Sequence, residues 1–216
     1  MDEKLIIEKT IEFVKETLNE AESGHDWWHV YRVWNLSKLI AKDEKNVNLF
    51  IVELGALLHD IADSKFHNGD EELGPKKARN FLLSLNVNEN IINEIELIIS
   101  RSSFKENYNG QKSIEFKIIQ DADKLDSLGA IGIARAFNFG GYFNRRIHNP
   151  NIQPNLNLSK DEYKKRESTS INHFYEKLLN LKDLMNTKKG KELAFKRHKF
   201  MEDYLNHFFD EWNLNN

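Results

Sequence analysis

Cysteine is absent from the 216 residues, which excludes disulfide bonds, thiolate metal sites and a cysteine nucleophile. Proline occurs only three times and strand-like alternation is nearly missing, so long helices should dominate. No uncharged stretch reaches the roughly 18 residues of a membrane span, and the charged N-terminus is unlike a signal peptide. These absences predict an all-α protein of the reducing cytoplasm without membrane contact.

The charges are mixed in sign. Lysine and arginine total 31 against 34 acidic residues, a net charge of -3, and no basic surface for nucleic acid is indicated. The length fits a single domain over residues 1–216. Within it we expect a core of about residues 20–137, a lid-like or disordered loop of about 138–160, and C-terminal helices of about 161–213.

Apolar spacing predicts the helices. The second helix should begin after Asp26, a plausible N-cap, and continue through Ile40. One helix should start at Ile114 and continue through Ala136, and Gly190 should separate the last two helices. Further helices are expected at about 2–18, 49–58, 75–85 and 88–99.

A histidine and a carboxylate end the apolar run of residues 49–58, which reads as a buried helix. Asp60 follows His59 directly, and Asp63 lies four residues after His59, so one helix end can gather all three side chains. A carboxylate removed from water must be paired, neutralised or bound to a metal. A helix end with a hydrogen-bonded core histidine is the plainer reading of these residues.

Other polar residues interrupt apolar helices in the same way. His25 and His29 are four residues apart, a spacing that suits one metal, although His29 can equally be a core histidine. Asp121 and Asp123 interrupt the helix from Ile114. Two imidazoles and two carboxylates form a nitrogen and oxygen donor set that suits Mn, Fe, Co, Ni or Zn better than Ca.

The pattern of His29, then His59-Asp60, then the distant Asp123 resembles the HD-domain phosphohydrolase superfamily. A subgroup of small bacterial cytosolic HD hydrolases is similar over nearly the whole chain. The matching stretches are residues 25–33, Lys65-Phe66, residues 128–137 and residues 172–178. The resemblance implies an all-α HD-domain helical bundle with a metal at its centre and, here, a C-terminal helical extension.

The resemblance also implies roles for single residues. It makes His29, His59, Asp60 and Asp123 the metal ligands, with Asp121 as the second candidate for the last place. Asp63 would prepare the attacking water. Cationic groups would stabilise the transferred phosphoryl group, and His25 could contact the substrate at the rim. The cationic candidates are Lys65, the first choice, followed by Arg101, Lys124 and Arg135, each of which can instead be a surface or ion-pair residue.

One metal ion is expected, with Mn favoured over Fe, Co, Ni, Mg or Zn. Relatives with two metals carry additional histidines between the His-Asp pair and the last aspartate, and only His67 lies in that interval. A di-iron oxygenase is therefore not expected.

The predicted function is metal-dependent hydrolysis of a nucleotide, with release of phosphate or pyrophosphate. The alternatives are a metal-holding nucleotide sensor without turnover, a structural helical protein, and, more narrowly, an alarmone hydrolase. The expected partner is a small phosphate ester. Phe208, Phe209 and Trp212 are candidates either for the core or for contacts in a homodimer.

Overall fold

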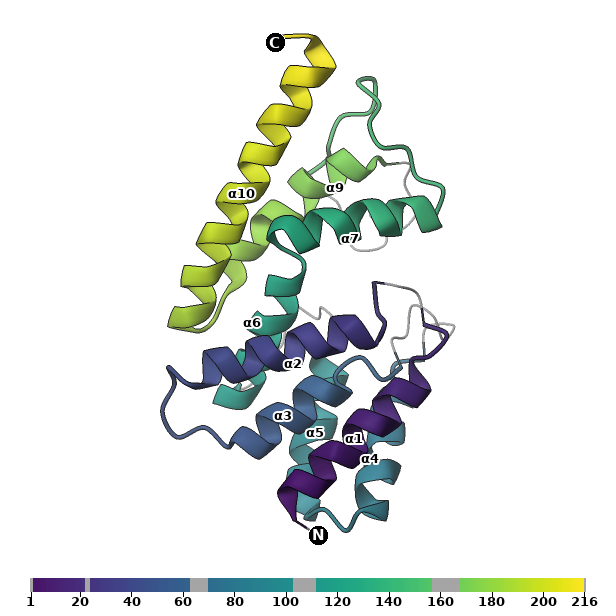
Figure 1. Ribbon diagram of the computed structural model, residues 1–216, viewed down its shortest axis with the longest axis vertical. Helices are drawn as coiled ribbons and strands as arrows, with labels where there is room; N and C mark the ends of the chain where they lie inside the picture. The colour runs from purple at the N-terminus through teal and green to yellow at the C-terminus, as the bar shows by residue number, and fades with distance from the viewer. Residues whose placement is uncertain (1, 22–23, 63–69, 103–111, 157–167, 216) are drawn as a thin grey trace. The chain divides into compact units, whose positions relative to one another are not determined.

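The computed structural model describes residues 2–21, 24–62, 70–102, 112–156 and 168–215. These residues form helices joined by turns and loops, and no strand occurs among them (Figure 1). The all-α prediction is confirmed. The chain divides into two compact units, residues 1–122 and 123–216, and the boundary falls inside helix α6. This division leaves the prediction of a single domain open. Among the described residues, no helix combines the length and the apolar character that crossing a bilayer requires.

The first unit contains α1 to α5 and the first nine residues of α6. The helices are α1 (Glu3–Thr17), α2 (Trp27–Ala41), α3 (Leu49–Leu58), α4 (Leu73–Ser84), α5 (Glu89–Ser102) and α6 (Ile114–Asp126). Helix α3 is the central element of this unit, because it packs against α1, α2 and α5. Seven of its ten residues are buried, which confirms the prediction of a buried helix.

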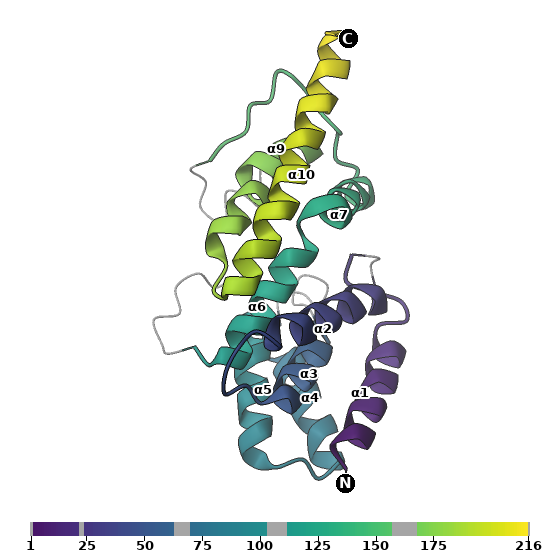
Figure 2. The ribbon, with the colours of Figure 1, turned by 60° about the vertical axis from the view of Figure 1, so that its left-hand side comes forward.

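The second unit contains the end of α6 and the remaining helices. These are α7 (Gly129–Tyr142), α9 (Ser170–Glu176), the 3-10 helix η2 (Leu178–Leu184) and α10 (Lys188–Asn213). Helix α10 packs against α7 and η2, and α9 packs against α7 and η2 (Figure 2). Phe208, Phe209 and Trp212 of α10 surround His148, with ring centroids 4.7 to 5.9 Å apart.

The prediction of a helix running from Ile114 through Ala136 is wrong, because α6 ends at Asp126 and α7 begins at Gly129. Gly129 has a φ of +73°, a conformation that costs glycine little and other residues much more. A Cβ on Gly132 would lie 2.3 Å from the Ser127 carbonyl oxygen. The small residues after Asp126 therefore permit a tight turn between two helices.

Two other boundaries differ from the prediction. Gly190 does not separate two helices but lies in the first turn of α10, because the Thr187 side chain accepts a hydrogen bond from the Gly190 N–H at 2.9 Å and caps the helix. The first five residues of the expected loop at 138–160 belong to α7. That helix ends where Asn144 takes a φ of +51° and the Arg145 N–H donates to the Gly140 carbonyl.

Candidate metal centre

His29 is placed by the start of α2. The Asp26 side chain accepts a hydrogen bond from the His29 N–H at 3.0 Å, which confirms Asp26 as the N-cap of this helix. His29 therefore lies in the first turn, on the face that also buries Val30 and Val33. Its exposed fraction is 1%, so its imidazole lies within the protein interior.

His59 directly follows the last residue of α3. Its Nδ1 lies 2.8 Å from the carbonyl oxygen of Ala56, and we assign the proton to Nδ1 because a carbonyl oxygen only accepts. Nε2 of a neutral His59 then carries a lone pair. This arrangement, a backbone carbonyl that orients an imidazole, is typical of histidines that bind metals.

The two buried histidines face each other through the same nitrogen. Nε2 of His29 lies 3.3 Å from Nε2 of His59, and the rings are tilted by 62°. Two nitrogen lone pairs at this distance repel each other unless a proton or a metal cation lies between them. The donor set therefore fits a cation, and neutral imidazole is a common ligand of divalent transition metals.

Asp60 adds a carboxylate next to this pair. Its Oδ2 lies 2.7 Å from His25 Nδ1 and 3.9 Å from His29 Nε2. Burial alone would raise the pKa of Asp60, but the hydrogen bond from His25 and the electrostatic attraction of His25, His59 and His29 outweigh it. The net effect lowers the pKa of Asp60 well below its usual range, so the carboxylate is ionised at neutral pH.

Asp123 of α6 supplies a third donor to this group. A Cβ on Gly55 would lie only 2.6 Å from Ile119 Cδ1, so the Ile119 side chain of α6 packs directly on the α3 backbone at that point. His59 and Asp123 follow these residues by four positions, about one helical turn. Among the described residues, the donor atoms of His29, His59 and Asp123 all lie within 4.8 Å of one another. Asp60 and Asp121 are not members of this group.

Several predicted site residues lie elsewhere or cannot be placed. Asp63 and Lys65, and also His67, fall outside the described residues. Arg101 lies in the last turn of α5. Lys124 donates to the Leu184 carbonyl at 2.9 Å, and Arg135 pairs with Asp126 at the same distance.

Gly55, which was not predicted to matter for the site, lies beside it in α3. Its signal is a glycine inside an apolar helix, four residues before a candidate ligand, and such a glycine often has a packing or functional reason.

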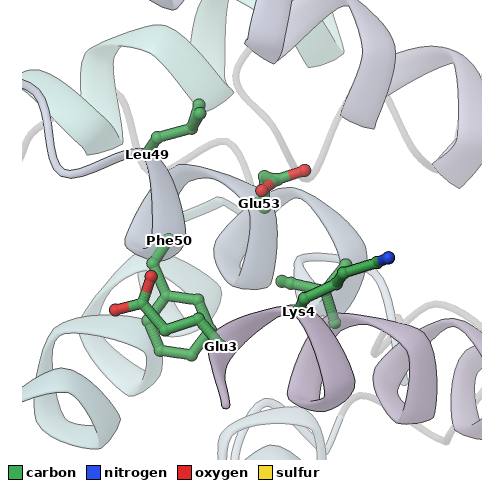
Figure 3. A pocket seen from close by; sticks show the side chains of 6 residues that line it. Glu3, Lys4, Leu49, Phe50 and Glu53 are labelled. Carbon is green, nitrogen blue, oxygen red and sulfur yellow. The ribbon is translucent and has the colours of Figure 1, made fainter.

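A groove of about 280 Å³ lies on the first unit between α1 and α3 (Figure 3). Its lining is Glu3, Lys4, Ile7, Leu49, Phe50 and Glu53. Glu53 is engaged there, because it accepts a hydrogen bond from Trp34 Nε1 at 3.1 Å. The lining includes no candidate metal ligand, so the groove is a feature separate from the histidine pair.

Comparison with known proteins identifies the family. A sequence model of the HD domain matches residues 27–128, the range that holds the His29, His59-Asp60 and Asp123 pattern. The solved structure of an HD-superfamily hydrolase from Bacillus thuringiensis is 43% identical, with a TM-score of 0.77, and the alignment covers 98% of this chain and 99% of that one. The chain belongs to the HD-domain superfamily. The resemblance inferred from the sequence is thereby confirmed.

Another relative is the uncharacterized protein YpgQ of Bacillus subtilis. It is 38% identical over 196 residues, which cover 89% of this chain and 87% of YpgQ. A crystal structure of YpgQ in complex with ADP has a TM-score of 0.76 at 33% identity, covering 98% of this chain and 97% of that one. These relatives span essentially the same length as this chain.

Proposed function

We propose that this HD-domain protein is a metal-dependent phosphohydrolase that acts on a nucleotide and releases phosphate or pyrophosphate. The observation that carries the proposal is the buried histidine pair, whose Nε2 atoms lie 3.3 Å apart beside the ionised Asp60. A nucleotide substrate is supported by the ADP complex of the relative YpgQ. Hydrolysis is supported by the family, which includes proteins named as hydrolases.

His29, His59, Asp60 and Asp123 would hold one divalent metal ion, with Mn²⁺ favoured. When bound, such an ion lowers the pKa of a coordinated water and polarises a phosphoryl oxygen. The chain prepares this donor set in two ways. His59 keeps its Nε2 lone pair because its Nδ1–H donates to Ala56, and Asp60 keeps its negative charge chiefly because His25 donates a hydrogen bond to it.

In the proposed reaction, a carboxylate oxygen of Asp63 accepts the proton of the attacking water. Lys65 and Arg101 are the preferred cations for binding the phosphate oxygens and for stabilising the charge of the transition state. Lys124 and Arg135 rank lower, because the Lys124 ammonium already donates to a carbonyl and Arg135 already pairs with buried Asp126.

The proposal is tested by measuring phosphate and pyrophosphate release from nucleoside mono-, di- and triphosphates, with added Mn²⁺ and with chelator. We expect metal-dependent release by the wild type, its loss in Asp60→Ala, and its retention in Asp210→Ala, which removes an exposed carboxylate from α10. Release that is insensitive to chelator would contradict the proposal. Bound metal without release from any nucleotide would instead support the sensor without turnover.

A further inference from the structure

His25 makes a contact that its sequence position does not suggest. Its Nδ1 lies 2.7 Å from Asp60 Oδ2, the distance of a strong hydrogen bond, and the two residues are 35 positions apart. Both side chains are largely buried, with exposed fractions of 17% for His25 and 14% for Asp60. The bond therefore joins the segment before α2 to the end of α3 in a site with little access to water.

The same contact distinguishes His25 from the metal-binding histidines. The His25 ring lies at the edge of the His29 ring, with centroids 5.9 Å apart, and its Nδ1 is directed at the carboxylate. Its geometry is that of a donor to a ligand.

We infer that His25 is a positioning residue, whose Nδ1–H holds the Asp60 carboxylate in the orientation that metal binding requires. The inference rests on the proposed function, in which Asp60 is a metal ligand. A carboxylate offers about four acceptor positions on its two oxygens, so it can accept a hydrogen bond from His25 and still bind a metal. Without that bond, the Asp60 side chain is free to rotate at the helix end.

The start of α2 thus contributes twice to the site. Asp26 caps the helix and places His29 in its first turn, and His25 immediately precedes this cap. The end of α3 supplies both His59 and the carboxylate that His25 holds. Hydrogen-bond partners of metal ligands typically change metal affinity 10- to 100-fold when they are removed.

Three substitutions test the inference. His25→Ala removes the donor. His25→Asn keeps a donor nitrogen on Cγ, where the imidazole carries Nδ1, whereas His25→Gln places its amide one bond further out, closer to the place of Nε2. The measurement is the dissociation constant for Mn²⁺, by calorimetry on chelator-treated full-length protein, followed by kcat and KM for nucleotide hydrolysis at saturating Mn²⁺.

We expect His25→Ala to weaken Mn²⁺ binding by about 10- to 100-fold, His25→Asn to recover most of that loss, and His25→Gln to recover little. At saturating Mn²⁺ the nucleotide KM should stay at the wild-type value. Wild-type Mn²⁺ affinity in His25→Ala together with a raised KM would overturn the inference and make His25 a substrate contact. If His25→Ala does not fold, equal Mn²⁺ affinities of His25→Asn and His25→Gln would overturn it.

The affinity measurement separates this inference from the proposed function. If the wild type binds Mn²⁺ but hydrolyses no nucleotide, the proposed hydrolase is refuted, and the three variants still decide the role of His25. If the wild type binds none of the divalent ions of Mn, Fe, Co, Ni, Mg and Zn, both are refuted.

Discussion

The replacement of Gly55 by alanine tests the contact between the Ile119 side chain of α6 and the α3 backbone one turn before His59. The added Cβ would lie 2.6 Å from Ile119 Cδ1 and 3.3 Å from Ile98 Cδ1. Both isoleucines are almost fully buried, with exposed fractions of 1% and 0%, so their methyl groups can move only by displacing other core atoms. Overpacking of this kind costs about 1–3 kcal/mol. The higher helix propensity of alanine offsets about 1 kcal/mol of this cost, so the unfolding free energy should fall by about 0–2 kcal/mol.

Gly141 provides a matched control. It also lies in a helix, near the end of α7, but a Cβ added there would meet nothing within 4 Å. Gly141→Ala should therefore stabilise the protein by about 0.5–1 kcal/mol through helix propensity alone. Because the propensity gain is common to both substitutions, the difference between their unfolding free energies isolates the overpacking. We expect this difference to be about 1–3 kcal/mol.

The assay is urea unfolding of both variants in the presence of chelator, followed by calorimetric titration with Mn²⁺. His59 lies one turn after Gly55, so a displacement of α3 from α6 should weaken Mn²⁺ binding in Gly55→Ala and leave it unchanged in Gly141→Ala. If Gly55→Ala stabilises the protein as much as Gly141→Ala and binds Mn²⁺ as the wild type does, the contact between the Ile119 side chain and the α3 backbone does not hold the site.

Four other predictions follow from the same residues. Mn²⁺ at about 100 times its dissociation constant should stabilise the wild type by about 2.7 kcal/mol, seen as a rise in Tm of roughly 5–10 °C, and a similar rise in His59→Ala would refute the site. Asp63→Asn should keep Mn²⁺ binding but lower kcat by about 10²-fold or more, and an unchanged kcat would end its assigned role. Asp126→Ala should cost about 3 kcal/mol in urea unfolding, because it leaves the largely buried Arg135 without its carboxylate, and a cost below about 1 kcal/mol would contradict this. The pKa of Asp60 is lower in the folded than in the unfolded protein, so the ionised carboxylate stabilises the fold. In chelator, the difference in unfolding free energy between the wild type and Asp60→Asn should therefore be full above about pH 5 and shrink as the pH falls below about 4. A difference that grows on acidification would contradict a lowered pKa of Asp60.

The starts of helices were predictable where a capping residue or a change in apolar spacing lies within a few residues of the start. Asp26 and Ile114 mark the beginnings of α2 and α6 correctly, because capping and apolar spacing act over one or two helical turns. The break after Asp126 was missed. It depends on a positive φ at Gly129 and on the packing of Gly132 against a carbonyl oxygen, which apolar spacing does not report.

The residue types of the site and the family were readable from the sequence alone, since histidine and aspartate inside apolar helices are costly without a partner. Only the tertiary structure decided which atoms meet. The approach of His29 to His59 spans 30 residues and the bond from His25 to Asp60 spans 35, and no local pattern encodes either contact. His25 was predicted as a substrate contact, and the tertiary structure adds a contact that the sequence did not predict, between its Nδ1 and the Asp60 carboxylate. The sequence determines which side chains are available for the site. Their geometry arises from helices that are brought together by the burial of their apolar faces.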